Sequence, residues 1–180
     1  MRLIILDRDG VINEDSDDFI KSVDEWRPIP GSIEAIARLT LNDYRVVVAT
    51  NQSGVARGLF DLDTLHAMHD KMHQLVEAAG GHIDAVFFCP HGPDEGCNCR
   101  KPKPGMLLDA AERLRTELND VPVIGDSLRD LQAAEAAGAL PILVRSGKGE
   151  RTLAQLDGGK GMRVYDDLAA AVEDILLENE

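Results

Sequence analysis

The stretch Leu3-Ile4-Ile5-Leu6-Asp7-Arg8-Asp9-Gly10 decides the fold that this sequence predicts. Four apolar residues followed by Asp and Gly are typical of a buried parallel strand that runs into a loop. Ligand sites in open α/β sheets lie at the carboxyl ends of strands. Asp7 and Asp9 would lie there, where paired carboxylates can bind a cation and attack an electrophile. The alternative is an acidic turn after a strand, since Asp-Gly is a common turn pair.

Apolar runs and helical patterns alternate along the rest of the chain. The strand-like runs are Leu3–Leu6, Val46–Ala49, Ala85–Phe88, Val121–Ile124 and Ile142–Val144. The helical segments are Ser32–Leu41, Asp63–Ala79, Met106–Leu118, Leu128–Ala137 and Asp167–Leu176. This alternation predicts an α/β three-layer sandwich with a mainly parallel, Rossmann-like sheet. A length of 180 residues predicts one domain, residues 1–180. The Gly-, Lys- and Asp-rich segment 147–161 is expected to be a mobile surface loop with a short helix.

Composition excludes several classes of protein. Hydrophobic residues make up 44% and charged residues 28% of the chain, an ordinary globular balance. The net charge of −13 argues against nonspecific nucleic-acid binding, which needs a basic surface. No apolar run approaches the roughly 20 residues that cross a bilayer, so no membrane association is expected. The chain opens on a core strand without room for a signal peptide, which predicts a cytoplasmic protein. We expect a monomer.

All three cysteines lie in one short segment with a histidine. Cys89 and His91 are separated by five residues from Cys97 and Cys99. Three thiols and one imidazole match a tetrahedral structural Zn²⁺ site, which predicts a zinc loop over residues 89–99. The alternatives are free thiols beside a surface histidine, or a disulfide, which leaves one cysteine over. Such a site has no open position, so the metal would fix the loop and aim the adjacent Arg100 and Lys101.

Three further segments carry recognisable patterns. Residues 45–54 are a β-branched strand ending in Thr50-Asn51-Gln52-Ser53; residues 99–106 are basic and precede a helix; residues 123–130 are a strand ending in Gly-Asp-x-x-x-Asp. With the opening stretch, these segments resemble, in order, the four motifs of the haloacid dehalogenase superfamily of phosphotransferases. The resemblance covers roughly residues 1–145. The gap from Asn13 to Pro30 is too short for an inserted cap domain, so a capless member with an open site is expected.

The resemblance implies phosphate-ester hydrolysis through an aspartyl-phosphate. Asp7 would be the nucleophile, and Asp9 would protonate the leaving alkoxide and then deprotonate water. Thr50 would hydrogen-bond a phosphoryl oxygen, and Lys101 would neutralise the developing charge. Lys103 is a rival for the role of Lys101.

Magnesium is the implied cofactor of this chemistry. The metal would be held by Asp7, the carbonyl of Asp9, and Asp126. Asp130, one helical turn beyond Asp126, would orient metal-bound water or Lys101 rather than bind the metal. Because the protein is acidic and the substrate an anion, Mg²⁺ and local cations must supply the positive potential.

The cysteine–histidine segment together with Cys-Arg-Lys-Pro narrows the resemblance to two families. One is the D-glycero-D-manno-heptose 1,7-bisphosphate 7-phosphatases of bacterial ADP-heptose and lipopolysaccharide biosynthesis, which residues 51–58 and 143–148 resemble most. The other is the histidinol-phosphate phosphatases, whose metal loop is equally short and whose cationic substrate would suit an acidic loop. A third interpretation is a zinc-stabilised binding domain without catalysis.

The expected partner is therefore a small phosphorylated molecule. Arg100 is predicted to hold a second phosphate with its bidentate guanidinium. The resemblance implies substrate contacts from Asp15, Ser16, Asp17, Asp18, Asn51, Gln52, Ser53 and Arg100.

One further pattern invites a metal interpretation. His66, His69 and His73 share a helical face, but no carboxylate partner is evident, and a half-exposed helix is the preferred interpretation.

Overall fold

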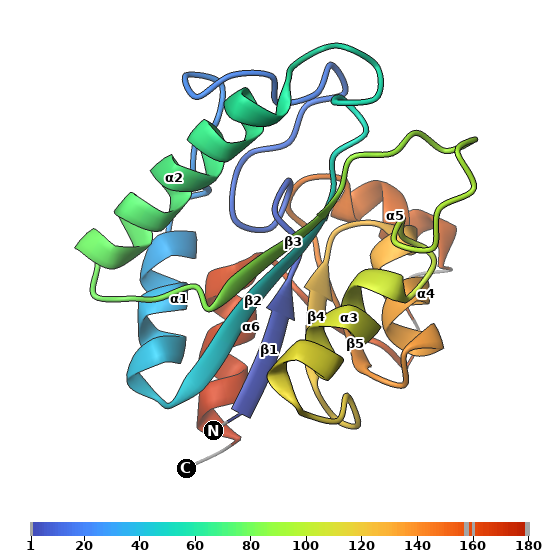
Figure 1. The fold of residues 1–180 in the computed structure, drawn as a ribbon. Coiled ribbons are helices and arrows are strands. Elements are labelled where there is room, and N and C mark those ends of the chain that lie inside the picture. The colour runs from blue at the N-terminus through green and yellow to red at the C-terminus, as the bar shows by residue number, and fades with distance from the viewer. Residues whose placement is uncertain (1, 157–158, 160, 179–180) are drawn as a thin grey trace.

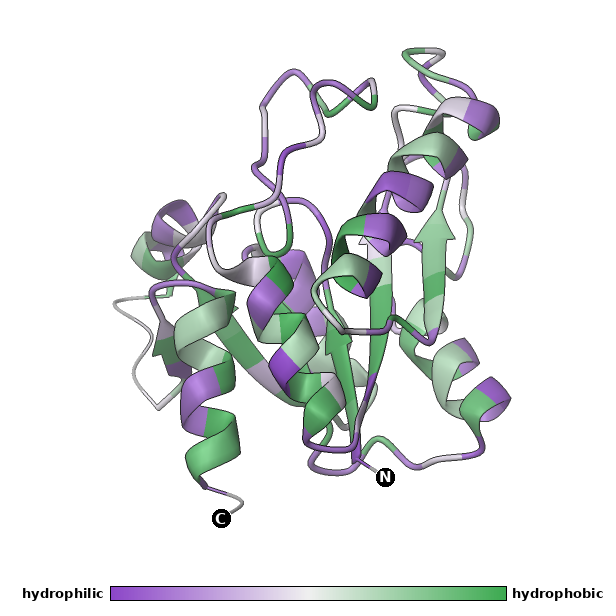
Figure 2. Ribbon diagram, turned by 90° about the vertical axis from the view of Figure 1, so that its left-hand side faces the viewer, coloured by the Kyte–Doolittle hydropathy of each residue, from purple (hydrophilic) through white to green (hydrophobic). Residues whose placement is uncertain are grey.

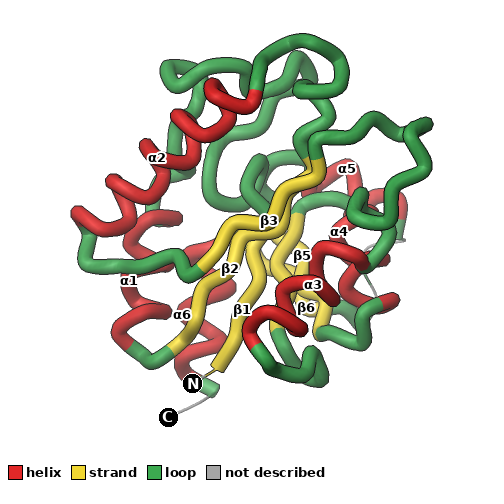
Figure 3. Tube along the Cα trace, in the orientation of Figure 1, coloured by secondary structure: helices red, strands yellow, loops and turns green. Residues whose placement is uncertain are grey.

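The computed structural model describes residues 2–156, 159 and 161–178. A six-stranded parallel sheet forms its centre (Figures 1 and 3). Its strands are β1 (Arg2–Leu6), β2 (Tyr44–Asn51), β3 (Ala85–Cys89), β4 (Pro122–Gly125), β5 (Leu140–Val144) and β6 (Arg163–Tyr165). The helices are α1 (Ser32–Leu41), α2 (Leu62–Ala78), α3 (Gly105–Leu114), α4 (Leu128–Ala136), α5 (Gly149–Gln155) and α6 (Leu168–Leu177). The predicted three-layer α/β sandwich is confirmed.

Helices cover both faces of the sheet. In Figure 1, α1, α2 and α6 lie on one side, and α3 and α4 lie on the other. Two apolar clusters match these layers, one joining the sheet to α1, α2 and α6 and the other joining it to α3 and α4. Figure 2 shows the reason in the sequence, because the strands are mainly hydrophobic whereas most helices carry both hydrophobic and hydrophilic residues.

The strand order β3-β2-β1-β4-β5-β6 places β1 in the interior of the sheet. Ile5 pairs with Val47 of β2 on one side and with Val123 of β4 on the other. The connections run outward in opposite directions from β1 and β4, so the sheet has its topological switch point between these strands. Ligand sites of doubly wound sheets lie at the carboxyl end of that point, where β1 delivers Asp7 and β4 delivers Asp126.

The sequence pattern was wrong about two elements. Helix α3 ends at Leu114 rather than at Leu118, because Arg115 adopts a left-handed conformation with φ 52° and stops the helix. Strand β6 was not predicted, since its three residues, Arg-Val-Tyr, form too short an apolar run. Residues 147–161, expected to form a surface loop with a short helix, do contain the short helix α5; residues 157, 158 and 160 lie outside the described part of the chain.

The segment from Asp9 to Gly31 crosses the carboxyl edge of the sheet without a helix or strand of its own, in agreement with a capless fold. Trp26 is its buried anchor. Lys71 of α2 donates to the carbonyls of Val23 and Trp26, at 2.8 and 2.6 Å, and its ammonium lies 5.8 Å from the Trp26 ring centroid. These contacts hold the segment beside the site. Across the described ranges, no helix has both the length and the apolar character needed to cross a membrane.

Candidate active site

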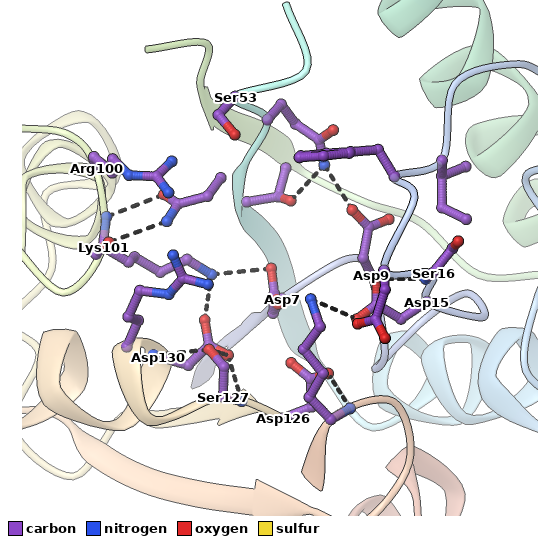
Figure 4. Close-up of a pocket in the computed structure, with 18 of the residues that line it drawn as sticks. Asp7, Asp9, Asp15, Ser16, Ser53, Arg100, Lys101, Asp126, Ser127 and Asp130 are labelled. Carbon is purple, nitrogen blue, oxygen red and sulfur yellow. Dashed lines mark hydrogen bonds and ion pairs between the residues drawn. The ribbon is translucent and has the colours of Figure 1, made fainter. Parts of the chain in front are cut away.

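A cavity of about 210 Å³ opens at the carboxyl ends of β1, β2 and β4 (Figure 4). Nearly all of the site residues predicted from the catalytic and substrate-binding patterns line it: Asp7, Asp9, Asp15, Ser16, Asp17, Thr50, Asn51, Gln52, Ser53, Arg100, Lys101, Asp126 and Asp130. Segments far apart in the chain therefore converge on one space.

Lys101 joins two carboxylates at the floor of the cavity. Its Nζ atom donates to Asp7 Oδ1 at 2.9 Å, to Asp130 Oδ1 at 2.5 Å and to the Ala49 carbonyl at 2.9 Å. All three hydrogens of the ammonium are thus engaged, and the residue is buried. Burial and the charge of Asp130 raise the pKa of Asp7 to about 7, against the opposing charge of Lys101. Lys103, the rival candidate, instead donates to the Cys97 carbonyl at 2.6 Å and does not line the cavity.

Asp130 lies in the first turn of α4 and is bound to the residue that precedes the helix. Its Oδ2 atom accepts from the backbone N–H and the hydroxyl of Ser127, at 3.0 and 2.7 Å, and its own backbone N–H donates to Ser127 Oγ at 3.4 Å, which completes a capping box. With Oδ1 on Lys101, both carboxylate oxygens are occupied. Asp130 is therefore placed to orient Lys101.

The donor set suits a divalent cation. Carboxylate oxygens of Asp7, Asp126 and Asp130 lie within 4.8 Å of one another. Burial, followed by the charges of Asp7 and Asp130, raises the pKa of Asp126 to about 9. Carboxylates forced together in this way are stabilised by a hard cation, and oxygen ligands are those that Mg²⁺ prefers. Because Asp130 is occupied by Lys101 and Ser127, Asp7 and Asp126 are the available side-chain ligands.

Two glycines shape the wall around Asp126. Gly10 has a φ of +83°, and a Cβ atom there would collide with the Asp126 carboxylate. Gly147 has a φ of +58° and packs against the same carboxylate. Asp126 Oδ2 also accepts the Lys148 backbone N–H at 2.8 Å. The carboxylate is thus held on one side by backbone alone.

Asp9 accepts three side-chain hydrogen bonds and forms an ion pair. Its Oδ1 atom accepts from Arg8 Nε at 2.9 Å and from Asn13 Nδ2 at 2.9 Å, and it forms an ion pair with Arg8 Nη2 at 2.8 Å. Its Oδ2 atom accepts from Gln52 Nε2 at 3.0 Å. Burial alone would raise the pKa of Asp9, but the Arg8 charge and these hydrogen bonds bring it below its usual range.

The end of β2 contributes four consecutive polar side chains. Gln52 Nε2 also donates to Thr50 Oγ1 at 2.9 Å, which links Thr50 to Asp9. Asn51 hydrogen-bonds the backbone of Lys101 through both of its amide atoms, at 3.0 and 3.1 Å. Its side chain is therefore committed to holding the Lys101 loop. Ser53 lies at the upper edge of the cavity in Figure 4.

Two ion pairs close one side of the cavity. Lys148 Nζ lies 3.2 Å from Asp15 Oδ2, and Arg151 of α5 binds both oxygens of Asp17, at 2.9 and 3.0 Å. The Arg151 hydrogen bonds lower the pKa of Asp17. Asp18, which was predicted to contact the substrate, is exposed and does not line the cavity; its backbone N–H donates to Ser16 Oγ at 3.1 Å.

Three cavity cations were missed by the sequence patterns. Arg57, Arg129 and Lys148 line the cavity together with Arg100. Burial lowers the pKa of Arg100, and the positive charges of Arg129 and Arg57 lower it further, which indicates that the three guanidiniums lie close together. Arg57 follows the second motif by a few residues and Arg129 directly precedes Asp130, so proximity to a motif was the available signal. Phe19, Ile20 and Ser127 complete the lining; Ser127 lies within the fourth motif, whereas Phe19 and Ile20 carried no such signal.

The cysteine–histidine cluster lies beside Arg100. His91 Nδ1 is 3.5 Å from Cys89 Sγ and 3.3 Å from Cys99 Sγ, and Cys89 Sγ is 3.7 Å from Cys97 Sγ. A tetrahedron with Zn–S bonds of about 2.3 Å has edges of roughly 3.8 Å, so the four atoms fit one zinc ion. A hydrogen bond from the Arg100 backbone N–H lowers the pKa of Cys97 to about 6 despite burial. Arg100 Nη1 donates to the His91 carbonyl at 3.3 Å, which links the cluster to the cavity.

Known proteins share both the sequence and the fold of this chain. A family described as HAD-hydrolase-like matches residues 98–171. D-glycero-β-D-manno-heptose-1,7-bisphosphate 7-phosphatase of Bordetella bronchiseptica is 61% identical over 178 residues, covering 99% of each chain. The enzyme of that name from Pseudomonas aeruginosa is 54% identical and covers 97% of each chain. The chain belongs to this phosphatase family.

Solved structures of the heptose-bisphosphate phosphatase family agree with the geometry above. The crystal structure of the B. bronchiseptica enzyme, complexed with magnesium and phosphate, matches with a TM-score of 0.96 at 61% identity over 99% of each chain. That of the Burkholderia thailandensis enzyme matches with a TM-score of 0.77 at 52% identity, covering 98% of this chain and 99% of that one. Family and fold thus confirm the resemblance to haloacid dehalogenase phosphatases.

Proposed function

We propose that this protein is a Mg²⁺-dependent phosphatase that removes the 7-phosphate of D-glycero-β-D-manno-heptose 1,7-bisphosphate. The observation that carries the substrate assignment is the 61% identity, over 99% of both chains, to a relative named for that reaction. The cavity supports the chemistry independently, because it brings a nucleophile, an acid–base group and several cations together.

In the first step, a carboxylate oxygen of Asp7 attacks the phosphorus of the 7-phosphate. The ester P–O bond breaks, and the leaving alkoxide takes a proton from Asp9. Oδ2 is the oxygen of Asp9 suited to carry this proton, because it has one donor whereas Oδ1 faces Arg8 and Asn13. The products are the sugar hydroxyl and an aspartyl-phosphate on Asp7.

In the second step, water opens the aspartyl-phosphate. Asp9 accepts a proton from the water as it attacks, the bond between phosphorus and Asp7 breaks, and phosphate leaves. Lys101 stays on Asp7 throughout and neutralises charge at the phosphoryl group, while Thr50 offers its hydroxyl. Asp130 keeps the Lys101 ammonium in place.

Asp7 and Asp126 are the side chains that would hold magnesium, with the Asp9 carbonyl as a further ligand. When bound, the ion supplies positive charge to the phosphoryl oxygens and orients them. The residues Cys89, His91, Cys97 and Cys99 would hold a zinc ion, which organises the loop that carries Arg100 and Lys101.

A bisphosphate substrate needs a second anion site. Arg57, Arg100 and Arg129 line the cavity and offer planar, bidentate donors. We assign the phosphate that is not transferred to this arginine cluster. The roles of the other predicted site residues, the monomeric state and the cytoplasmic location stay predictions.

Histidinol phosphate is the rival substrate. Its cationic groups would need free carboxylates on the loop formed by residues 15–18. Asp15 and Asp17, the carboxylates of residues 15–18 that line the cavity, are instead paired with Lys148 and Arg151, so this segment presents little free negative charge to the cavity. This pairing favours the sugar bisphosphate.

The decisive experiment compares turnover of the two substrates. Purified protein with Mg²⁺ is given heptose 1,7-bisphosphate or histidinol phosphate, and phosphate release is measured at several concentrations. We expect kcat/KM to be higher for the bisphosphate, with heptose 1-phosphate as the product. Faster release from histidinol phosphate would reverse the substrate assignment, and no release from either would refute phosphatase activity.

A further inference from the structure

Arg8 lies between the two catalytic aspartates in the sequence but does not line the cavity. Its side chain is fully buried, with 0% exposed. Nε donates to Asp9 Oδ1 at 2.9 Å, and Nη2 lies 2.8 Å from the same oxygen without the alignment of a hydrogen bond. Arg8 therefore supports Asp9 from behind, on the side opposite to the substrate.

The other end of the Arg8 guanidinium meets His69 of α2. Nη1 is 3.2 Å from His69 Nε2, and the imidazole is only 6% exposed. A guanidinium has no acceptor and stays charged in proteins, so Nη1 is the donor and Nε2 the acceptor. The His69 ring must then be neutral, with its proton on Nδ1. In agreement, burial and the Arg8 charge lower the pKa of His69 to about 3.

This contact is what fixes the guanidinium. Nη1 has no other hydrogen-bonding partner among the residues that the structure describes, and a buried donor without a partner is costly. Without His69, Arg8 would have to turn toward another acceptor, and the two atoms that face Asp9 would turn with it. The ring is itself held against Phe88 of β3, with centroids 6.1 Å apart. The position of α2 over the sheet is thus coupled to the orientation of Asp9 through the side chains of His69 and Arg8.

The same contact explains the histidine pattern of α2. His69 is buried, whereas His66 is exposed and His73 is half-buried. Because Nε2 of His69 is already occupied by Arg8, the three histidines do not form a metal site. The helical face that carries these histidines is half-exposed, as the sequence predicts, but it includes the buried contact between His69 and Arg8, which the sequence pattern did not indicate.

We propose that His69 is a positioning residue for catalysis: it accepts from Arg8 and so holds Asp9 in the orientation that delivers a proton to the leaving alkoxide. This inference rests on the proposed phosphatase reaction, in which Asp9 is the acid. It assigns no proton transfer to His69 itself.

The test compares substrates whose leaving groups differ in their need for a proton. The variants are His69→Leu, which removes the acceptor, His69→Gln, which keeps one, and His73→Leu as a control on the same helix. kcat/KM, which covers the steps through departure of the leaving group, is measured with heptose 1,7-bisphosphate and with p-nitrophenyl phosphate. The phenolate of the second substrate departs without a proton, so it does not need a well-placed acid.

We expect His69→Leu to lower kcat/KM for the sugar bisphosphate roughly 10–100-fold, the loss typical of a misplaced catalytic group, and for p-nitrophenyl phosphate less than about threefold. His69→Gln should recover the sugar bisphosphate activity to within about threefold of wild type. His73→Leu should resemble wild type on both substrates. Thermal unfolding of each variant establishes that folded protein is compared.

Equal losses on the two substrates would overturn the inference, since they indicate general damage to the site. So would unchanged activity of His69→Leu, or a His69→Gln variant as impaired as His69→Leu. If His69→Leu does not fold, His69→Met replaces it in the same comparison. A wild-type protein that hydrolyses neither substrate refutes the proposed function instead, so the two failures are distinct.

Discussion

Asn51 and Lys101 exchange two hydrogen bonds, side chain to backbone. Asn51 Oδ1 accepts the Lys101 N–H at 3.0 Å, and Asn51 Nδ2 donates to the Lys101 carbonyl at 3.1 Å. The end of β2 is thereby joined to the loop that carries the buried ammonium. Since Lys101 Nζ is bound to Asp7 and Asp130, the position of the Lys101 backbone decides where positive charge meets the nucleophile.

Replacing Asn51 by Leu should therefore reduce catalysis without removing any group proposed to touch phosphate. We expect kcat to fall roughly 10²-fold, because a displacement of about 1 Å in a catalytic group has an effect of that size. Steady-state phosphate release measures this change. Asn51→Asp keeps the acceptor for the Lys101 N–H and should lose less. A kcat equal to wild type in Asn51→Leu would show that the loop is held by other contacts.

Replacing Asp7 by Asn should abolish turnover, because an amide cannot form the aspartyl-phosphate. Acid quenching with labelled substrate should trap phosphate on the wild-type protein and none on the variant. The control is Asp18→Asn, which changes an exposed carboxylate outside the cavity and should stay within about twofold of wild type. Turnover by a folded, non-deamidated Asp7→Asn protein would move the nucleophile elsewhere.

Replacing Arg100 by Ala should weaken the site for the second phosphate. We expect kcat/KM for heptose 1,7-bisphosphate to fall roughly 10–100-fold, the loss of one charge-assisted contact of about 1.5–3 kcal/mol. A monophosphate of similar size should suffer much less. Arg113→Ala, which removes an exposed guanidinium of α3, serves as the control. Equal losses on the two substrates would mean that Arg100 serves the phosphoryl group that is transferred.

The two metals should be separable. EDTA should stop activity, and added Mg²⁺ should restore it, whereas the thiolate-bound zinc should be removed more slowly. Cys97→Ser should lower zinc content in elemental analysis and reduce kcat, because the backbone of Arg100 and Lys101 is then less well fixed. Wild-type protein that carries no zinc after purification in metal-replete medium would refute the loop assignment.

His69 should make the fold sensitive to acid. Its pKa is about 3 in the folded protein and about 6.5 in an unfolded chain, so between these values the unfolded chain binds the additional proton. Stability from the neutral ring is therefore present above pH 6.5 and is lost as the pH falls toward 3. Between pH 7 and pH 5 the loss from this group is about 2 kcal/mol. Urea unfolding at both pH values measures it, and His69→Gln should show a loss smaller by that amount. Identical losses in the two proteins would contradict a neutral, buried His69.

The fold could be predicted because its decisive signals are local. Helix α1 has the predicted bounds, Ser32–Leu41, since a turn precedes it and its apolar residues are regularly spaced. The location of the candidate site could be predicted because Asp7, Thr50 and Asp126 lie at or just after the ends of strands, and parallel strands end at one edge of a sheet. Strand β6 escaped detection because its three residues owe their conformation to pairing with β5.

Contacts between distant segments had no local signal. Arg8 and His69 are 61 residues apart, and nothing near either residue indicates the other. Asp17 and Arg151 are both exposed side chains of ordinary appearance, and only the folded chain brings them together. Asp18 lies outside the cavity lining for a related reason, since no periodicity along an irregular loop tells which of its carboxylates faces inward.

The interior location of β1 has a consequence for the order in which the site can be assembled. Ribosomes deliver Asp7 and Asp9 early, yet their neighbours Asp126 and Lys148 come much later, and the Ser146 hydroxyl that binds the Gly10 carbonyl lies 136 residues downstream. A nascent chain that ends before β4 leaves one edge of β1 without a partner and its two carboxylates without the opposite wall of the cavity. The complete active site therefore forms only when the late strands pack against β1, so that an unfinished chain contains the nucleophile but cannot hydrolyse substrate.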